Sequence, residues 1–165
     1  MDNLLNSEAT TTLILLGILI VSYGILRSIF FPAVKKLANR TSTFIDDLFL
    51  DKKFLNRLSY VVVFIIFNIL TATPEFSIDL FSNVIVSRLI DAAFALLVGL
   101  TILEVLSVFN KISEKIDVLK DRPIKGYIQI LKIIISAFVV IIIFAIVTGQ
   151  SVAYYISGLG ALTAV

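Results

Sequence analysis

Four ionisable residues interrupt otherwise apolar stretches of the chain: Arg27, Arg88, Asp91 and Glu104. A charge inside a membrane-spanning helix is costly and marks a candidate for charge pairing, a proton relay or a substrate site. Arg88 and Asp91 stand three residues apart, so on a helix they share a face and can neutralise each other. We interpret them as a local pair near the outer membrane interface. Arg27 and Glu104 could pair between helices, but we prefer the interpretation that each reaches toward the lipid headgroups.

Catalytic chemistry is poorly represented. The chain has no Cys and no His, which excludes thiolate chemistry, imidazole metal ligation and histidine acid–base catalysis. No phosphate-binding glycine loop, nucleophile elbow or zinc-ligand spacing is present. The sequence therefore predicts no enzyme activity, no cofactor and no metal site.

The composition is that of a membrane protein. Hydrophobic residues make up 59% of the chain and charged residues 16%, and the mean hydropathy is +1.05. A soluble domain of this length could not bury so much apolar surface. The net charge of +2 is too small to indicate a nucleic-acid partner. The lipid bilayer is the expected environment.

Positive charge is concentrated in two zones. Of the 14 Lys and Arg residues, six lie in 32–57 and six in 110–132. Because positive residues favour cytoplasmic loops, both zones are predicted to face the cytoplasm and the N-terminus to lie outside. The residues expected to anchor or couple helices at these zones are Lys35, Lys36, Arg122 and Lys125.

The stretches around these zones predict an all-α membrane protein with five transmembrane helices, the last one truncated. A helix of about 20 residues crosses about 30 Å of hydrocarbon. Pro32 should end the first helix, and segment 33–57 is either an amphipathic helix at the interface or a solvated hairpin. The predicted spans are about 11–31, 58–73, 83–109, 127–148 and 152–165.

The last of these helices differs in composition from the others. It is rich in small residues, which let helix backbones approach closely, and Gly160 and Ala164 have small-xxx-small spacing. Such a helix suits a place where identical helices crowd around an axis. Ordinary packing within one subunit explains the composition equally well. The small residues singled out are Gly158, Gly160, Ala161 and Ala164.

Several motifs near the end of the chain together resemble a known family. They are PIKGY at 123–127, GQS at 149–151 and SGLGA at 157–161, followed by Ala164 and Val165. The combination resembles the MscS-like mechanosensitive channels, and most closely their five-span miniconductance (YbdG-like) branch. KKFLNRLSY at 52–60 is similar to that branch more loosely.

The resemblance implies a homoheptamer in the inner (plasma) membrane of a bacterial-type cell. Residues 1–126 would form a tension-sensing paddle, and 127–165 the helices next to the pore. Gly158, Gly160, Ala161 and Ala164 would map onto the packing or pore-lining surface of the last helix. Such a channel opens under membrane tension and releases ions and small osmolytes during hypoosmotic stress.

The chain also departs from the family. In the family the pore helix continues into cytoplasmic β and α/β domains, whereas these 165 residues end at Val165. We therefore expect a fragment of a longer protein. The alternative function is a non-channel membrane scaffold or regulatory module. A secondary transporter is disfavoured, because paired broken helices and a midplane charge cluster are not recognisable.

Overall fold

The computed structural model describes residues 2–38, 51–76, 81, 83–113 and 124–163. Within these residues every regular element is a helix, which confirms the predicted all-α class. The chain divides into two compact units, Met1–Val86 and Ser87–Val165. The division by role into 1–126 and 127–165 stays a prediction.

The first helical stretch runs through Pro32 without ending there. α1 covers Asp2–Ile25, a π-helical segment η1 covers Leu26–Phe30, and α2 covers Phe31–Ala38. Our prediction that Pro32 ends the helix was wrong. A proline ring clashes with the carbonyl four residues earlier in a regular α-helix. Here a wider π turn, in which Phe31 N–H donates to the Leu26 carbonyl, precedes the proline and lets the helix continue.

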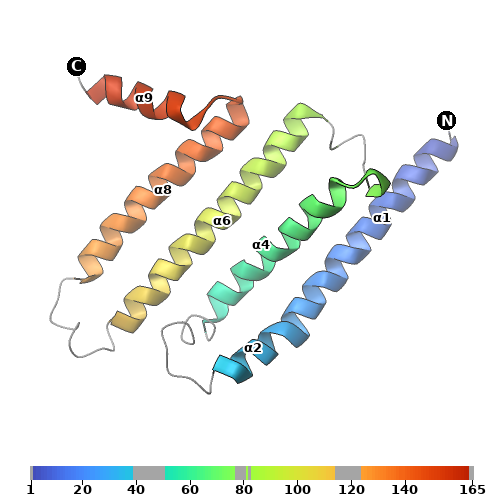
Figure 1. Cartoon of the computed structure of the whole chain (residues 1–165), viewed down its shortest axis with the longest axis horizontal. Helices are drawn as coiled ribbons and strands as arrows, with labels where there is room; N and C mark the ends of the chain where they lie inside the picture. The colour runs from blue at the N-terminus through green and yellow to red at the C-terminus, as the bar shows by residue number, and fades with distance from the viewer. Residues whose placement is uncertain (1, 39–50, 77–80, 82, 114–123, 164–165) are drawn as a thin grey trace. The chain divides into compact units, whose positions relative to one another are not determined.

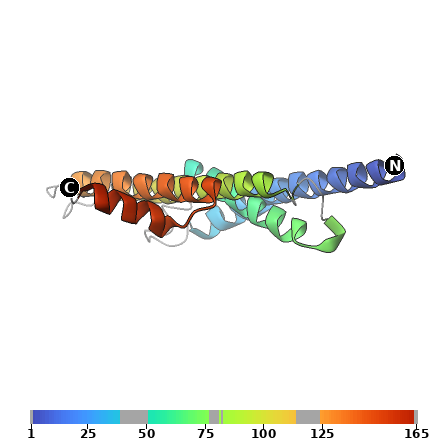
Figure 2. The same cartoon turned by 90° about the horizontal axis from the view of Figure 1, so that it is seen from above.

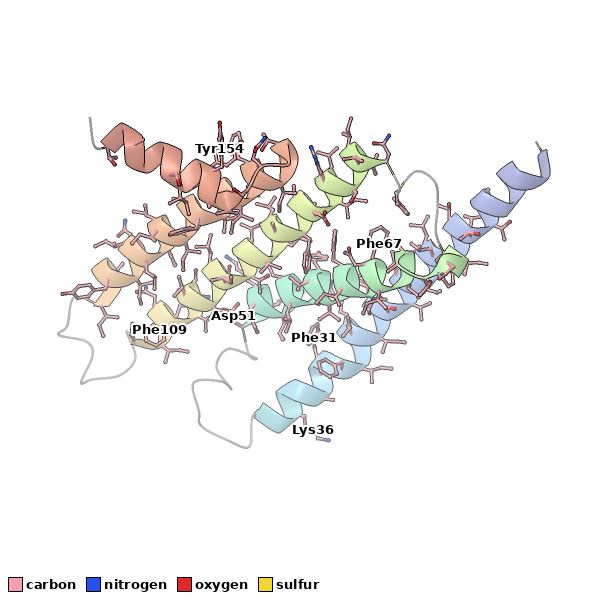
Figure 3. The ribbon with its side chains drawn as sticks, turned by 45° about the horizontal axis from the view of Figure 1, so that its top comes forward. Phe31, Lys36, Asp51, Phe67, Phe109 and Tyr154 are labelled. Carbon is pink, nitrogen blue, oxygen red and sulfur yellow. The ribbon has the colours of Figure 1, made fainter. Side chains whose placement is uncertain are left out.

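α4 covers Lys52–Thr71 and thus begins earlier than the predicted start at residue 58. Its start is fixed by Asp51, whose carboxylate accepts hydrogen bonds from the N–H groups of Lys53 and Phe54 at 2.9 and 3.1 Å. This N-cap satisfies backbone donors that would otherwise be left open at the helix end. Figure 3 shows Asp51 at this first turn. The short 3-10 helix η2, Pro74–Phe76, follows α4.

α1 and α4 pack side by side in the first unit (Figure 1). The rings of Tyr23 and Tyr60 stack with centroids 5.9 Å apart and planes 6° from parallel. Ser59 is only 2% exposed, and its hydroxyl donates to the Leu55 carbonyl at 2.9 Å. The buried polar group is therefore satisfied within its own helix.

The second unit contains α8, α9 and all but the first turn of α6. α6 covers Val84–Ser113, α8 covers Ile124–Thr148 and α9 covers Val152–Thr163. The predicted spans 83–109 and 127–148 match α6 and α8 apart from a longer C-terminal end of α6 and an earlier start of α8. Seen from above, α9 leaves the layer that α6 and α8 form (Figure 2).

Four helical segments are long and apolar enough to cross a membrane: Ala9–Ala33, Lys52–Thr71, Val84–Ser113 and Ile124–Thr148. α9 is not one of them within the described residues. Its 12 residues rise about 18 Å, against about 30 Å of hydrocarbon. We predicted five membrane spans, whereas the described part of the chain has four helices that are long and apolar enough to be spans.

These four helices expose most of their apolar side chains. Only 6% to 22% of the residues in their most apolar stretches are buried. Ile20, Ile85 and Tyr127 are each about 70% exposed. A water-soluble protein rarely presents such continuous apolar surface, so lipid or a neighbouring subunit is the natural environment for these faces.

Candidate functional site: the α6–α8 pair and the α9 turn

Two contacts join α6 to α8, and a third joins α6 to the turn that follows α8. Arg88 lies beside Gly149, Gly99 lies against Val139, and Ser107 is hydrogen-bonded to Lys132. Residue numbers rise along α6 as those of its partners fall, which is the register of an antiparallel helix pair. The contacts are thus spread from Arg88, near the start of α6, to Ser107, near its end.

The contact between Gly99 and Val139 is tightly packed. Gly99 is buried, and a Cβ atom added to it would lie 2.6 Å from Cγ2 of Val139. No side chain larger than hydrogen fits there without a shift of Val139. Small residues at helix contacts let membrane helices pack closely, so Gly99 sets the spacing of the pair.

Arg88 reaches the turn between α8 and α9. A Cβ atom at Gly149 would collide with the Arg88 guanidinium, so the charged group lies directly over that turn. A cation at this place is favourable, because the carbonyl groups at the end of a helix carry partial negative charge. Asp91 is exposed on α6, and no ion pair joins it to Arg88 in the described part of the chain. In place of the expected local pair, Arg88 contacts the turn that follows α8.

The turn itself is tightly specified. Gly149 has a φ of +71°, and the N–H groups of Gly149 and Gln150 donate to the carbonyls of Ile146 and Ala145. This is the Schellman pattern that ends a helix at a glycine. Ser151 then caps α9, accepting a hydrogen bond from the Tyr154 N–H at 3.2 Å.

A second polar contact ties α9 back to α8. The hydroxyl oxygens of Thr148 and Tyr155 are 2.9 Å apart and share a hydrogen bond. The exit direction of α9 is thus held by a glycine turn, a serine cap and a side-chain bond.

The described small residues of α9 lie open. Gly158, Gly160 and Ala161 are all exposed, and a Cβ atom at either glycine would meet nothing within 4 Å. Ala164 lies outside the described residues. Figure 3 shows Tyr154 projecting from the first turn of the helix. An open groove of about 780 Å³ runs along it, lined by Ser151, Ala153, Tyr154, Tyr155, Ser157, Gly158 and Leu159.

The contact between Ser107 of α6 and Lys132 of α8 is polar, and it was not predicted from the sequence. Lys132 donates to the Ser107 hydroxyl at 2.9 Å, about two turns into α8. We had counted Lys132 with the loop cations, although it falls inside the predicted span 127–148. Glu104, one turn from Ser107 on α6, is only 7% exposed. A cavity of about 180 Å³ adjoins the contact, lined by Asn110, Lys125, Ile128, Gln129 and Lys132.

The other residues that the sequence singled out do not gather at one site in the described part of the chain. Arg27 is exposed and donates to the Tyr23 hydroxyl at 2.7 Å, with its guanidinium 5.9 Å from the ring centre. Arg27 and Glu104 belong to different units, so a pair between them stays a prediction. Lys36 is exposed at the end of α2 and Figure 3 shows it pointing away from the helix. Lys35 lies in the same helix, and Arg122 lies outside the described residues.

The described residues hold no group of three or more acidic side chains that could bind a metal ion. No family model, curated protein or solved structure matches the chain. The candidate functional region is therefore defined by the structure alone. It consists of the α6–α8 pair and the turn between α8 and α9.

Proposed function

We propose that this chain forms the membrane region of an ion channel that opens under membrane tension and releases ions and small osmolytes during hypoosmotic stress. The observation that carries the proposal is the exposed small-residue surface of α9, formed by Gly158, Gly160 and Ala161. A Cβ atom at either glycine would meet only open space, so another helix can approach the α9 backbone closely there.

A self-associating α9 gives the simplest use of this surface. Copies of α9 from several subunits would crowd around one axis, with α9 as the proposed fifth membrane helix. The resemblance of 123–127, 149–151 and 157–161 to the MscS-like family supports this arrangement and its heptameric count. A bacterial-type plasma membrane is the corresponding location.

The α6–α8 contacts suggest how tension would reach α9. Tension favours whichever conformation occupies more membrane area. A tilt of α6 would carry Arg88 with it, and Arg88 lies over the turn at Gly149. The capped turn would then redirect α9, changing the packing of the central helices.

Patch recordings of the complete protein in liposomes test this proposal. Gly160→Leu and Ala161→Leu should lower the suction needed for opening, because a bulky side chain weakens a closely packed closed ring. Gly17→Leu is the matched control, since a Cβ atom at Gly17 in α1 also meets nothing within 4 Å. Absence of tension-activated current, or unchanged thresholds in both α9 variants, contradicts the proposal.

The alternative is a scaffold or regulatory module that binds lipid or partner helices without conducting. It predicts normal membrane insertion and self-association with no current at any suction. The same recordings therefore separate the two functions.

A further inference from the structure

The cavity between the end of α6 and the start of α8 has a basic lining. Its α8 wall is made by Lys125, Ile128, Gln129 and Lys132, whose spacing of three, four and seven residues places them on one helix face. Asn110 of α6 supplies the opposite wall. Two lysines and two amides thus line the space, and none of its described lining residues is acidic.

Lys132 is the less easily explained of the two cations. It lies within a membrane-spanning helix, where an ammonium group is costly without a counter-charge. Its hydrogen-bond partner is the neutral Ser107 hydroxyl, and the described residues give it no ion pair. An ammonium group has three donors, so two remain to be directed at an anion in the cavity.

We propose that this cavity binds the phosphate of an anionic phospholipid headgroup. Lys125 at the start of α8 and Lys132 about 10 Å deeper would hold the phosphodiester between them, with Gln129 and Asn110 as neutral donors. A volume of about 180 Å³ equals about six water molecules, enough for a phosphate but not for acyl chains. The chains would lie along exposed apolar residues of α8 such as Ile130, Ile133 and Ile134.

The position of the cavity favours a lipid headgroup over free phosphate as its ligand. All the residues that line the cavity belong to the basic zone 110–132, which the charge distribution predicts to be cytoplasmic. Anionic lipids are concentrated in the cytoplasmic leaflet, and basic pockets between membrane helices bind their headgroups. The site would therefore meet its ligand at a high local concentration.

Native mass spectrometry of the complete protein, titrated with dioleoyl phosphatidylglycerol, measures this binding. Lys125→Gln and Lys132→Gln should each weaken the lipid about fivefold, the contribution of one lysine near an anionic headgroup. Lys132→Arg should retain binding. If Lys132→Gln does not fold, Lys125→Gln carries the same prediction, because Lys125 is exposed at the helix start. The readout does not depend on channel activity.

Lys53→Gln is the matched control, because Lys53 is an exposed cation at the start of α4 that does not line the cavity. It should leave the affinity unchanged. The proposal is overturned if dioleoyl phosphatidylcholine binds as tightly as phosphatidylglycerol, or if the cavity variants behave like Lys53→Gln. It is also overturned if inorganic phosphate displaces the lipid at equal concentration, since the site would then take free anions.

Discussion

Gly149 combines two constraints in a single residue. Its φ of +71° is reached easily by glycine, and the Arg88 guanidinium occupies the space where a Cβ atom would point. Gly149→Ala should lower the stability by about 1–2 kcal/mol for the left-handed backbone alone, with a further loss from the collision. Thermal unfolding of the purified protein in detergent measures this change.

Two further variants separate the causes. Gly126→Ala, at an exposed helical position with nothing within 4 Å of its Cβ, should be neutral or stabilising by up to about 1 kcal/mol. Adding Arg88→Ala to Gly149→Ala should recover only the part due to the collision. If Gly149→Ala is as stable as the wild type, the turn geometry described above is incorrect.

At the residue scale the sequence identified candidates but not their partners. The spacing of Arg88 and Asp91 is compatible with a local pair, and nothing in it reveals that Gly149, some sixty positions away, competes for the guanidinium. Lys132 could have been found, because it lies inside a predicted span. Gly99 carried a weaker signal, since a glycine in an apolar stretch indicates a helix contact only once the facing helix is known.

At the scale of the helices, the accuracy of the predicted helix ends depended on which local residue, a glycine, a proline or a cap, determines the end. The predicted end of a span at residue 148 was correct, because the turn at Gly149 satisfies the last carbonyls of α8 in a way few residues can. Pro32 misled us, since the π segment before it relieves the clash that normally ends a helix. The start of α4 was placed too late because the capping role of Asp51 was not recognised.

The cap of α4 gives a direct test at this scale. Asp51→Ala should destabilise the protein by about 1 kcal/mol, because the N–H groups of Lys53 and Phe54 lose their acceptor. Asp51→Asn should remain close to the wild type, since asparagine caps helices as well as aspartate. Thermal unfolding in detergent compares the two variants. Equal losses in both would show that the charge of Asp51, rather than the cap, is responsible.

The α6–α8 contact is a property of two elements and calls for a paired substitution. Gly99→Ala should cost about 1–3 kcal/mol, the range for overpacking a tight contact, because the new methyl group would lie 2.6 Å from Val139 Cγ2. Val139→Ala in the same protein removes that obstacle and should restore most of the loss. A double variant no more stable than Gly99→Ala would mean that the helices do not meet at these residues.

For the whole molecule, composition was sufficient to predict helices and a membrane, because apolar runs of about 20 residues have few other uses. It could not decide the status of α9. That helix has 12 described residues and departs from the α6–α8 layer (Figure 2), and a short apolar helix can cross part of a membrane or lie on it. Whether α9 enters the membrane depends on what covers its exposed small residues.

Labelling with a membrane-impermeant maleimide decides between a fifth span and a surface helix. The chain has no cysteine, so single introduced cysteines report one site each. Gln150→Cys, in the exposed turn before α9, should label from outside, and Lys111→Cys, near the end of α6, only after permeabilisation. If α9 enters the membrane, Thr163→Cys should resist labelling from outside, because the helix carries it inward. Labelling of Thr163→Cys as fast as Gln150→Cys would place α9 on the outer surface, and a pore lined by α9 would then be excluded.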